Sequence, residues 1–252
     1  MNLRYIYTII DSPIEYTKQQ VYNWTFNTAF ISDFLSKNVR KLKIDVPDFN
    51  FLAIMLQKSP KQTRQMDCFK SLNVYILCSQ ADMDNITRIT NFEERVEAYL
   101  SIYERAYYIA NEYCDIQIDK LLYLNQMFRN CGYRNEWLFK KKMIREYSIY
   151  VFLKCYFTSV DFRLELEVYN LKQTILLTKG IVLRTAPGKI CFGKDFNKGI
   201  KIEDNKMYLL DFLEEPKFEF DLDQLSKGIF NVSYKQPLFD WEETLDKINW
   251  LK

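Results

Sequence analysis

The sequence contains no histidine, and this absence excludes several kinds of catalytic and metal site. Histidine is the side chain that changes charge near neutral pH, and it is the commonest metal ligand in proteins. A Ser-His-Asp triad, an HExxH zinc site and a two-histidine iron site all require it. An enzyme of this composition has to use carboxylates, alone or with a divalent ion, or a lysine or tyrosine with a shifted pKa. We predict that the protein holds no cofactor and no metal.

Glycine and proline are also scarce, at six residues each among 252, which excludes collagen-like and low-complexity chains. Hydrophobic residues make up 48% and aromatic residues 16% of the chain. A chain of this length therefore has enough apolar surface for one large domain or two small ones. The longest apolar stretch, near residues 147–160, is interrupted by Lys154 and is too short to span a bilayer. We predict a compact protein that does not enter a membrane.

Closely spaced cysteine pairs are absent as well, because the six cysteines lie ten or more residues apart. No CxxC pair indicates a structural zinc or redox site, and buried free thiols are the simplest interpretation. The first eleven residues include an apolar stretch, but they lack the small-residue cleavage site of an export signal. We predict a location in the reducing cytoplasm.

The first half of the chain, residues 1–132, is predicted to be a mixed region of strands and three helices. Residues 3–10 are β-branched and aromatic and predict a strand. Ser12-Pro13-Ile14-Glu15 has the capping serine, first-turn proline and N3 glutamate that begin a helix, which its apolar face extends to Leu35. Further apolar runs predict strands at 49–57 and 72–78 and helices at 92–114 and 115–129.

The second half, residues 133–252, is predicted to be rich in antiparallel strands. Residues 160–169 alternate apolar and charged side chains with the period of a strand that has one solvated face. Other strands are predicted at 137–145, 148–157, 174–185, 189–192 and 207–212, and a short amphipathic helix at 240–251. Their short connections favour a meander, because a crossover helix would not fit between them. The fold class is therefore α+β, and the two halves are either separate domains or one continuous domain.

Three carboxylates in the alternating strand form a candidate catalytic cluster. Glu165 and Glu167 share one face of the strand with Asp161, and paired carboxylates can hold a divalent ion in a nuclease-like site. A solvated polar face that keeps a sheet soluble explains the same pattern. The metal-dependent nuclease or phosphoryl-transfer enzyme is therefore an alternative hypothesis.

A basic and aromatic segment forms a candidate nucleic-acid surface. Its residues are Trp137, Lys140, Lys141, Lys142 and Arg145. Basic side chains with interleaved aromatic rings are typical of proteins that bind single-stranded DNA or RNA. The formal charge of the whole chain is only +2, however, and gives little long-range attraction for phosphates. A nucleic-acid-binding accessory subunit is a second alternative.

Acidic residues interleaved with aromatic residues near the C-terminus form a candidate partner-binding surface. Its residues are Glu214, Glu215, Phe218, Asp221, Asp223, Phe239, Trp241 and Glu242. Charge steers the encounter of two proteins, and buried aromatic rings supply much of the binding energy. We therefore favour a non-enzymatic protein that inhibits or sequesters another protein, such as a toxin or effector, by covering its surface. Immunity proteins and antitoxins of bacterial conflict systems act in this way.

Overall fold

The computed structural model describes residues 1–11, 15–187, 199–211 and 213–235. Over these residues the fold is α+β, as predicted, and the chain divides into two compact units, Met1–Asn135 and Glu136–Lys252. The helices are α1 (Lys18–Leu42), α2 (Gln80–Arg88), α3 (Phe92–Cys114), α4 (Ile118–Asn130) and α6 (Leu222–Ser226). None of the helices within the described ranges is both long and apolar enough to cross a membrane.

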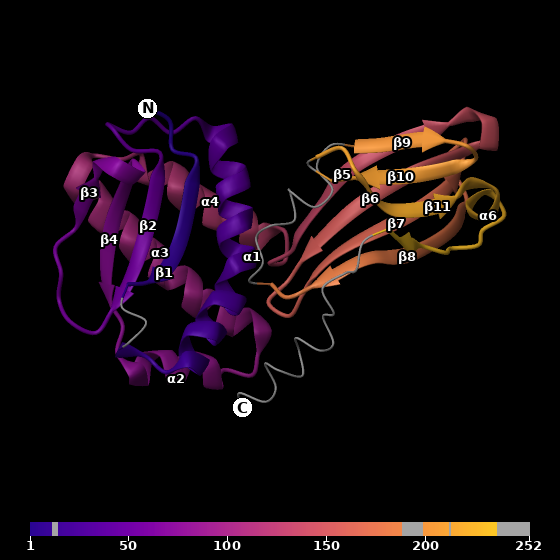
Figure 1. The fold of residues 1–252 in the computed structure, drawn as a ribbon. Helices are drawn as coiled ribbons and strands as arrows, with labels where there is room; N and C mark the ends of the chain where they lie inside the picture. Colours follow the sequence, from indigo (N-terminus) through magenta and orange to yellow (C-terminus); the bar gives the residue numbers. More distant parts are fainter. Residues whose placement is uncertain (12–14, 188–198, 212, 236–252) are drawn as a thin grey trace. The chain divides into compact units, whose positions relative to one another are not determined.

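The first unit contains one four-stranded sheet. Its strands are β1 (Tyr5–Ile10), β2 (Phe51–Gln57), β3 (Arg64–Met66) and β4 (Ser71–Leu77), in the order β1-β2-β4-β3. The first, second and fourth are parallel, and β3 is antiparallel to β4. Helices α3 and α4 lie behind this sheet and α1 runs along β1 (Figure 1). The parallel strands therefore end at one common edge, which Asp11, Lys58 and Cys78 directly follow.

Strand β1 is an outer strand of this sheet, and α1 supplies the hydrogen bonds that a further strand would make. The backbone nitrogen of Ile6 donates to Ser36 Oγ over 3.0 Å, and the same hydroxyl donates to the Ile6 carbonyl over 3.1 Å. Ser36 is buried, with 2% of its surface exposed. Both backbone groups of Ile6 that face away from β2 are thus satisfied.

The helix starts differ in detail from the prediction. Helix α1 begins at Lys18, because Thr17 and Gln20 form a capping box, whereas the predicted start at Ser12-Pro13-Ile14 lies outside the described residues. Helix α2 was not predicted. Only Met83 of its nine residues is buried, so the segment has no apolar stripe, although Ser79 and Asp82 form a capping box.

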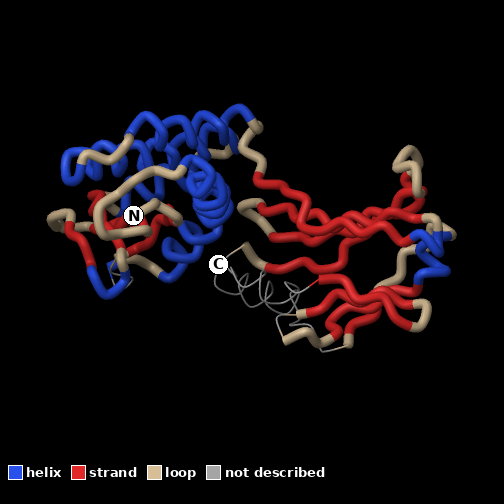
Figure 2. The backbone as a smooth tube through the Cα atoms, turned by 90° about the horizontal axis from the view of Figure 1, so that it is seen from above, coloured by secondary structure: helices blue, strands red, loops and turns tan. Residues whose placement is uncertain are grey.

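The second unit contains two four-stranded sheets that form separate layers (Figure 2). One has the order β5-β6-β7-β8, from β5 (Asn135–Ile144), β6 (Ile149–Phe157), β7 (Phe162–Asn170) and β8 (Leu176–Thr185). The other has the order β12-β11-β10-β9, from β9 (Gly199–Glu203), β10 (Lys206–Leu210), β11 (Pro216–Asp221) and β12 (Ser233–Tyr234). Each sheet follows chain order, so the predicted meander is confirmed. The division into two sheets was not predicted.

Apolar side chains from both sheets form the core of this unit. Every second residue of β6 and β7 is buried, including Leu153 and Leu166, together with Leu209 of β10. Tyr234 of β12 donates a hydrogen bond to the carbonyl of Val182 in β8 over 3.4 Å and so joins the sheets. The strand predicted at 189–192 and the helix predicted at 240–251 lie outside the described residues.

Candidate interaction surface

Two glutamates of β7, Glu165 and Glu167, are buried on the face of the sheet that points away from the core. Each has 5% of its surface exposed. The strand register places Lys154 of β6 opposite Glu165 and Lys179 of β8 opposite Glu167. Each lysine pairs with the diagonal glutamate: Lys154 Nζ lies 2.6 Å from Glu167 Oε2, and Lys179 Nζ lies 2.7 Å from Glu165 Oε2. The prediction that these carboxylates lie on a solvated face is therefore wrong.

The third predicted carboxylate, Asp161, also pairs with cations. It is 4% exposed, and its Oδ2 lies 2.6 Å from Arg184 Nε and 3.4 Å from Arg163 Nε. Thr158 Oγ1 donates to its other oxygen over 3.1 Å. Within the described ranges, no group of three or more His, Cys, Asp or Glu side chains is placed to hold a metal ion. The structure does not bring Asp161, Glu165 and Glu167 together as metal ligands.

The pKa of Glu167 reflects a balance between burial and positive neighbours. Burial alone raises the pKa of a carboxyl group, because it disfavours the charged form. Hydrogen bonds from Lys154 and Tyr169, with the charges of Lys154 and Lys179, outweigh burial and hold the pKa of Glu167 below its usual value. The same hydrogen bond to Glu167 raises the pKa of Lys154. These groups are therefore stable ion pairs at neutral pH, and neither is an available acid or base.

Aromatic rings surround the paired charges on the same face. The rings of Tyr150 and Phe152 stack with centroids 5.5 Å apart, and Tyr169 meets Phe152 edge to face at 5.4 Å. Phe152, Lys154 and Tyr169 line a pocket of about 330 Å³ together with Leu138 and Gln173. A volume near 300 Å³ is at the lower end of small-molecule sites and suits a single inserted side chain.

The predicted basic segment lies on β5, an outer strand of this sheet, and its lysines do not share one side. Side chains of a strand alternate, so Lys140 and Lys142 lie on the side of the pocket residue Leu138, whereas Lys141 lies on the other. Trp137 lies on the side of Lys141, with its ring 6.1 Å from that of the buried Phe162. The structure therefore divides the predicted nucleic-acid surface.

The lysines of β5 are nevertheless the free positive charges of this region. Lys140, Lys141, Lys142 and Arg145 are all exposed. Among the described residues, none of them has a carboxylate oxygen within 4.0 Å. The residues that form what we call the aromatic–basic face are Lys140, Lys142, Tyr150, Phe152, Lys154, Tyr156, Arg163, Tyr169 and Lys179.

The predicted acidic surface is not continuous. Glu214 and Glu215 lie at the turn before β11, whereas Asp221 is the last residue of β11 and caps α6, and Asp223 lies in that helix. A six-residue strand separates the two pairs by about 17–20 Å. The prediction that Phe218 contacts a partner is wrong, because it is fully buried in the core, where its alternating position on β11 places it. Phe239, Trp241 and Glu242 lie outside the described residues.

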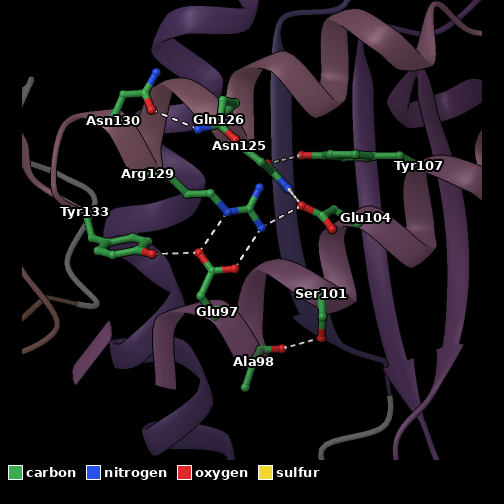
Figure 3. Close-up of polar contacts among 10 residues, drawn as sticks. All are labelled: Glu97, Ala98, Ser101, Glu104, Tyr107, Asn125, Gln126, Arg129, Asn130 and Tyr133. Carbon is green, nitrogen blue, oxygen red and sulfur yellow. Dashed lines mark hydrogen bonds and ion pairs between the residues drawn. The ribbon is translucent and has the colours of Figure 1, made fainter. Parts of the chain in front are cut away.

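A second charged cluster joins α3 to α4 in the first unit (Figure 3). Arg129 of α4 forms two 2.8 Å hydrogen bonds with the carboxylate of Glu97 and a third, 2.9 Å long, with Glu104. Tyr133 donates to Glu97 over 2.7 Å, and the fully buried Asn125 donates to Glu104 over 3.2 Å. The hydrogen bonds from Arg129 lower the pKa of Glu97. All of these groups are bonded to one another, so we assign this cluster a structural role.

Comparison of the chain with known protein families, with curated proteins and with solved structures gives no match.

The aromatic residues of this face were not predicted from the sequence as a site. In Ile149–Phe157 the residues at alternate positions are apolar and buried, and those between them are Tyr150, Phe152, Lys154 and Tyr156. Because aromatic rings are also apolar, the segment has no simple apolar–polar alternation. Taking the odd-numbered and even-numbered residues of this strand as two sets distinguishes the core side from the aromatic side.

Proposed function

We propose that this protein is a non-enzymatic binding protein that covers the surface of an acidic protein partner with its aromatic–basic face. Inhibition or sequestration by covering a surface is how immunity proteins and antitoxins act. The observation that carries the proposal is the aromatic pocket beside the unpaired lysines of β5. We place this activity in the reducing cytoplasm, where the exposed thiols of Cys68 and Cys131 would remain reduced.

The charges on the face favour an acidic partner. The buried carboxylates of β7 and of Asp161, which precedes it, are already paired with lysines and arginines, so they cannot attract a basic protein. Lys140 and Lys142 remain free for a partner's carboxylates. Complementary charge speeds association and excludes partners of the wrong sign. The acidic side chains that the sequence predicts to bind a partner are instead separated along β11.

The aromatic rings supply a means of binding that needs no reaction. Tyr residues are enriched among the residues that dominate interface energies, and they lose little conformational entropy on binding. Here the ring of Phe152 packs against the rings of both Tyr150 and Tyr169. The pocket beside them accepts one side chain of a partner as an anchor.

The two alternative functions have weaker support. The nuclease hypothesis needs open carboxylates, and those of β7 each contact a lysine or an arginine. The nucleic-acid hypothesis needs Trp137 beside the lysines as a stacking platform, and its ring packs near Phe162. Both are outcomes of the experiment below.

The experiment compares two charge reversals on neighbouring residues of one strand. Tagged wild-type protein, Lys142→Glu and Lys141→Glu are purified from the native cells at physiological salt, and half of each sample is treated with nuclease before mass spectrometry. We expect one stoichiometric acidic protein that survives nuclease, is lost with Lys142→Glu and is kept with Lys141→Glu. The two variants change the charge equally and differ in the side of β5 that they alter.

Two results would contradict the proposal. A partner that nuclease releases would indicate nucleic-acid binding. A partner that both variants lose equally would show that the net charge of the strand matters and that the aromatic–basic face does not.

A further inference from the structure

A second group of cations lies in the first unit, along the connection that leads from the edge where the parallel strands end to the start of β3. The connection from β2 to β3 contains Lys58 and Lys61 and leads into Arg64, the first residue of β3. All three are exposed, so they are accessible to solutes. In open sheets with parallel strands, ligands bind at the carboxyl ends of the strands. The start of this connection is therefore in the position where such a sheet carries a binding site, and its end brings Arg64 beside Asn73 of β4.

Aromatic rings lie beside these cations. Lys61 Nζ lies 5.8 Å, and Arg64 Cζ 5.9 Å, from the centroid of the Tyr75 ring. Lys58 Nζ lies 4.9 Å from the centroid of Tyr16, and Tyr16 is itself fixed by a 2.9 Å hydrogen bond from its hydroxyl to the carbonyl of Cys78. Tyr75 is 7% exposed, so its ring is fixed by the side chains packed around it. Cation–π contacts thus orient both Lys61 and Arg64 over one ring.

These side chains line a pocket of about 370 Å³, formed by Lys61, Gln62, Thr63, Arg64 and Tyr75. Its lining contains two cations, a hydroxyl and an amide but no carboxylate. Lys61 pairs with Asp11, which follows β1. Arg64 has no carboxylate within 4.0 Å among the described residues. The pocket therefore keeps an unpaired guanidinium group beside several neutral donors.

We infer that this pocket binds the phosphate group of a small molecule. A guanidinium offers two parallel N–H donors that match two phosphate oxygens, and a free guanidinium favours phosphate over a neutral ligand. The Thr63 hydroxyl, the Gln62 amide and the Lys61 ammonium supply further donors, and the charge of Lys61 is balanced by Asp11. The volume lies within the range of small-molecule sites, which leaves room for a group attached to the phosphate. This site is separate from the aromatic–basic face, and it does not depend on the proposed function.

The test is calorimetric titration of the full chain at low salt with three probes: inorganic phosphate, adenosine 5′-monophosphate and adenosine. We expect both phosphates to bind, adenosine not to bind, and Arg64→Gln to weaken phosphate binding about tenfold or more, since a hydrogen bond to a charged group contributes about 1.5–3 kcal/mol. Arg88→Gln is the matched control, because Arg88 is an exposed arginine of the same unit that does not line the pocket. Unfolding midpoints of both variants check that they fold.

Each outcome decides the inference. Tighter binding of the nucleotide than of inorganic phosphate supports it and identifies a phosphorylated organic ligand, and equal binding supports it and identifies free phosphate. No heat from either phosphate at millimolar concentration overturns it. Equal binding of adenosine and its monophosphate, or equal weakening by Arg64→Gln and Arg88→Gln, also overturns it.

Discussion

The charged cluster on β7 and the charged cluster between α3 and α4 contain similar ion pairs, but the carboxylate is buried only in the first. On β7 the carboxylate of Glu167 is the buried member, with 7% of its side chain exposed, and its partner Lys154 is 36% exposed. Between the helices the guanidinium of Arg129 is 26% exposed and the carboxylate of Glu97 is 38% exposed. When one partner of an ion pair is removed, the charge that remains is therefore hydrated to a different extent in the two clusters. We expect this difference to determine how much the free energy of unfolding falls.

The largest effect is expected when the lysines are removed from β7. The double variant Lys154→Met/Lys179→Met leaves Glu165 and Glu167 buried without their ammonium partners. Arg163 still lies 3.5 Å from Glu165, whereas Glu167 keeps no cation among the described residues. We expect the free energy of unfolding to fall by about 3 kcal/mol, because a buried carboxylate that loses its cation is strongly destabilising. Urea unfolding measures the loss, and hydrogen exchange locates it in β6–β8.

Its control is Lys141→Met/Lys172→Met, which removes two exposed lysines of the same unit. A loss equal to that of the control would show that the β7 carboxylates do not depend on their lysines.

A smaller effect is expected between the helices. Arg129→Met removes three hydrogen bonds to carboxylates, but Glu97 and Glu104 are exposed enough to be hydrated in its absence. We expect a loss of about 2 kcal/mol in the free energy of unfolding, a value typical of hydrogen bonds to charged groups. Hydrogen exchange should show faster opening of α3 and α4. Arg105→Met, an exposed arginine on α3, should have no such effect.

A still smaller effect is expected when the buried member on β7 is neutralised. In Glu167→Gln the lysines remain and can turn to water, so we expect the free energy of unfolding to fall by less than about 1 kcal/mol, as for an exposed ion pair. This value should lie well below the loss from removing Lys154 and Lys179. If the two variants lose equal free energy of unfolding, burial of the carboxylate does not determine the size of the loss, and the two clusters do not differ in the way described.

The smallest effect is expected from mild acid. The pKa values of Glu97 and Glu167 are both lowered in the folded protein, so their stabilisation is complete above the unfolded value of about 4.3 and is lost as the pH falls through the folded values. Between pH 7 and pH 5 unfolding should therefore change little through these groups. Below pH 4 stability should fall, and Glu97→Gln and Glu167→Gln should each reduce the fall. A loss above pH 5 that these variants abolish would contradict the direction of both pKa shifts.

The sequence was sufficient to predict strand β7 and which of its side chains share a face, because the period of a strand depends only on neighbouring residues. It was not sufficient to predict that Glu165 and Glu167 are buried. Their burial depends on the register that brings Lys154 and Lys179 beside them, and register is a property of three strands together.

The same limit applies to the candidate surfaces. Phe218 was grouped with acidic neighbours along the chain, yet its position on β11 turns it into the core. Lys140, Lys141 and Lys142 are consecutive, and the strand alternation that separates them could have been applied from the sequence alone. The phosphate pocket could not have been found in this way, because Tyr75 is brought to Lys61 and Arg64 only by the order of the strands.

The two hydrogen bonds of Ser36 also bear on how copies of this chain can assemble. An exposed outer strand is a template on which another chain can add a strand, and such addition leads to aggregation or to shared sheets. At Ile6 the groups that would receive the added strand are already taken by one hydroxyl. A Ser36→Ala variant would leave both groups of Ile6 buried beneath α1 without a hydrogen-bond partner, because Ile6 and Ser36 are 0% and 2% exposed. One hydroxyl and the helix that carries it therefore occupy this position of β1 in place of another strand.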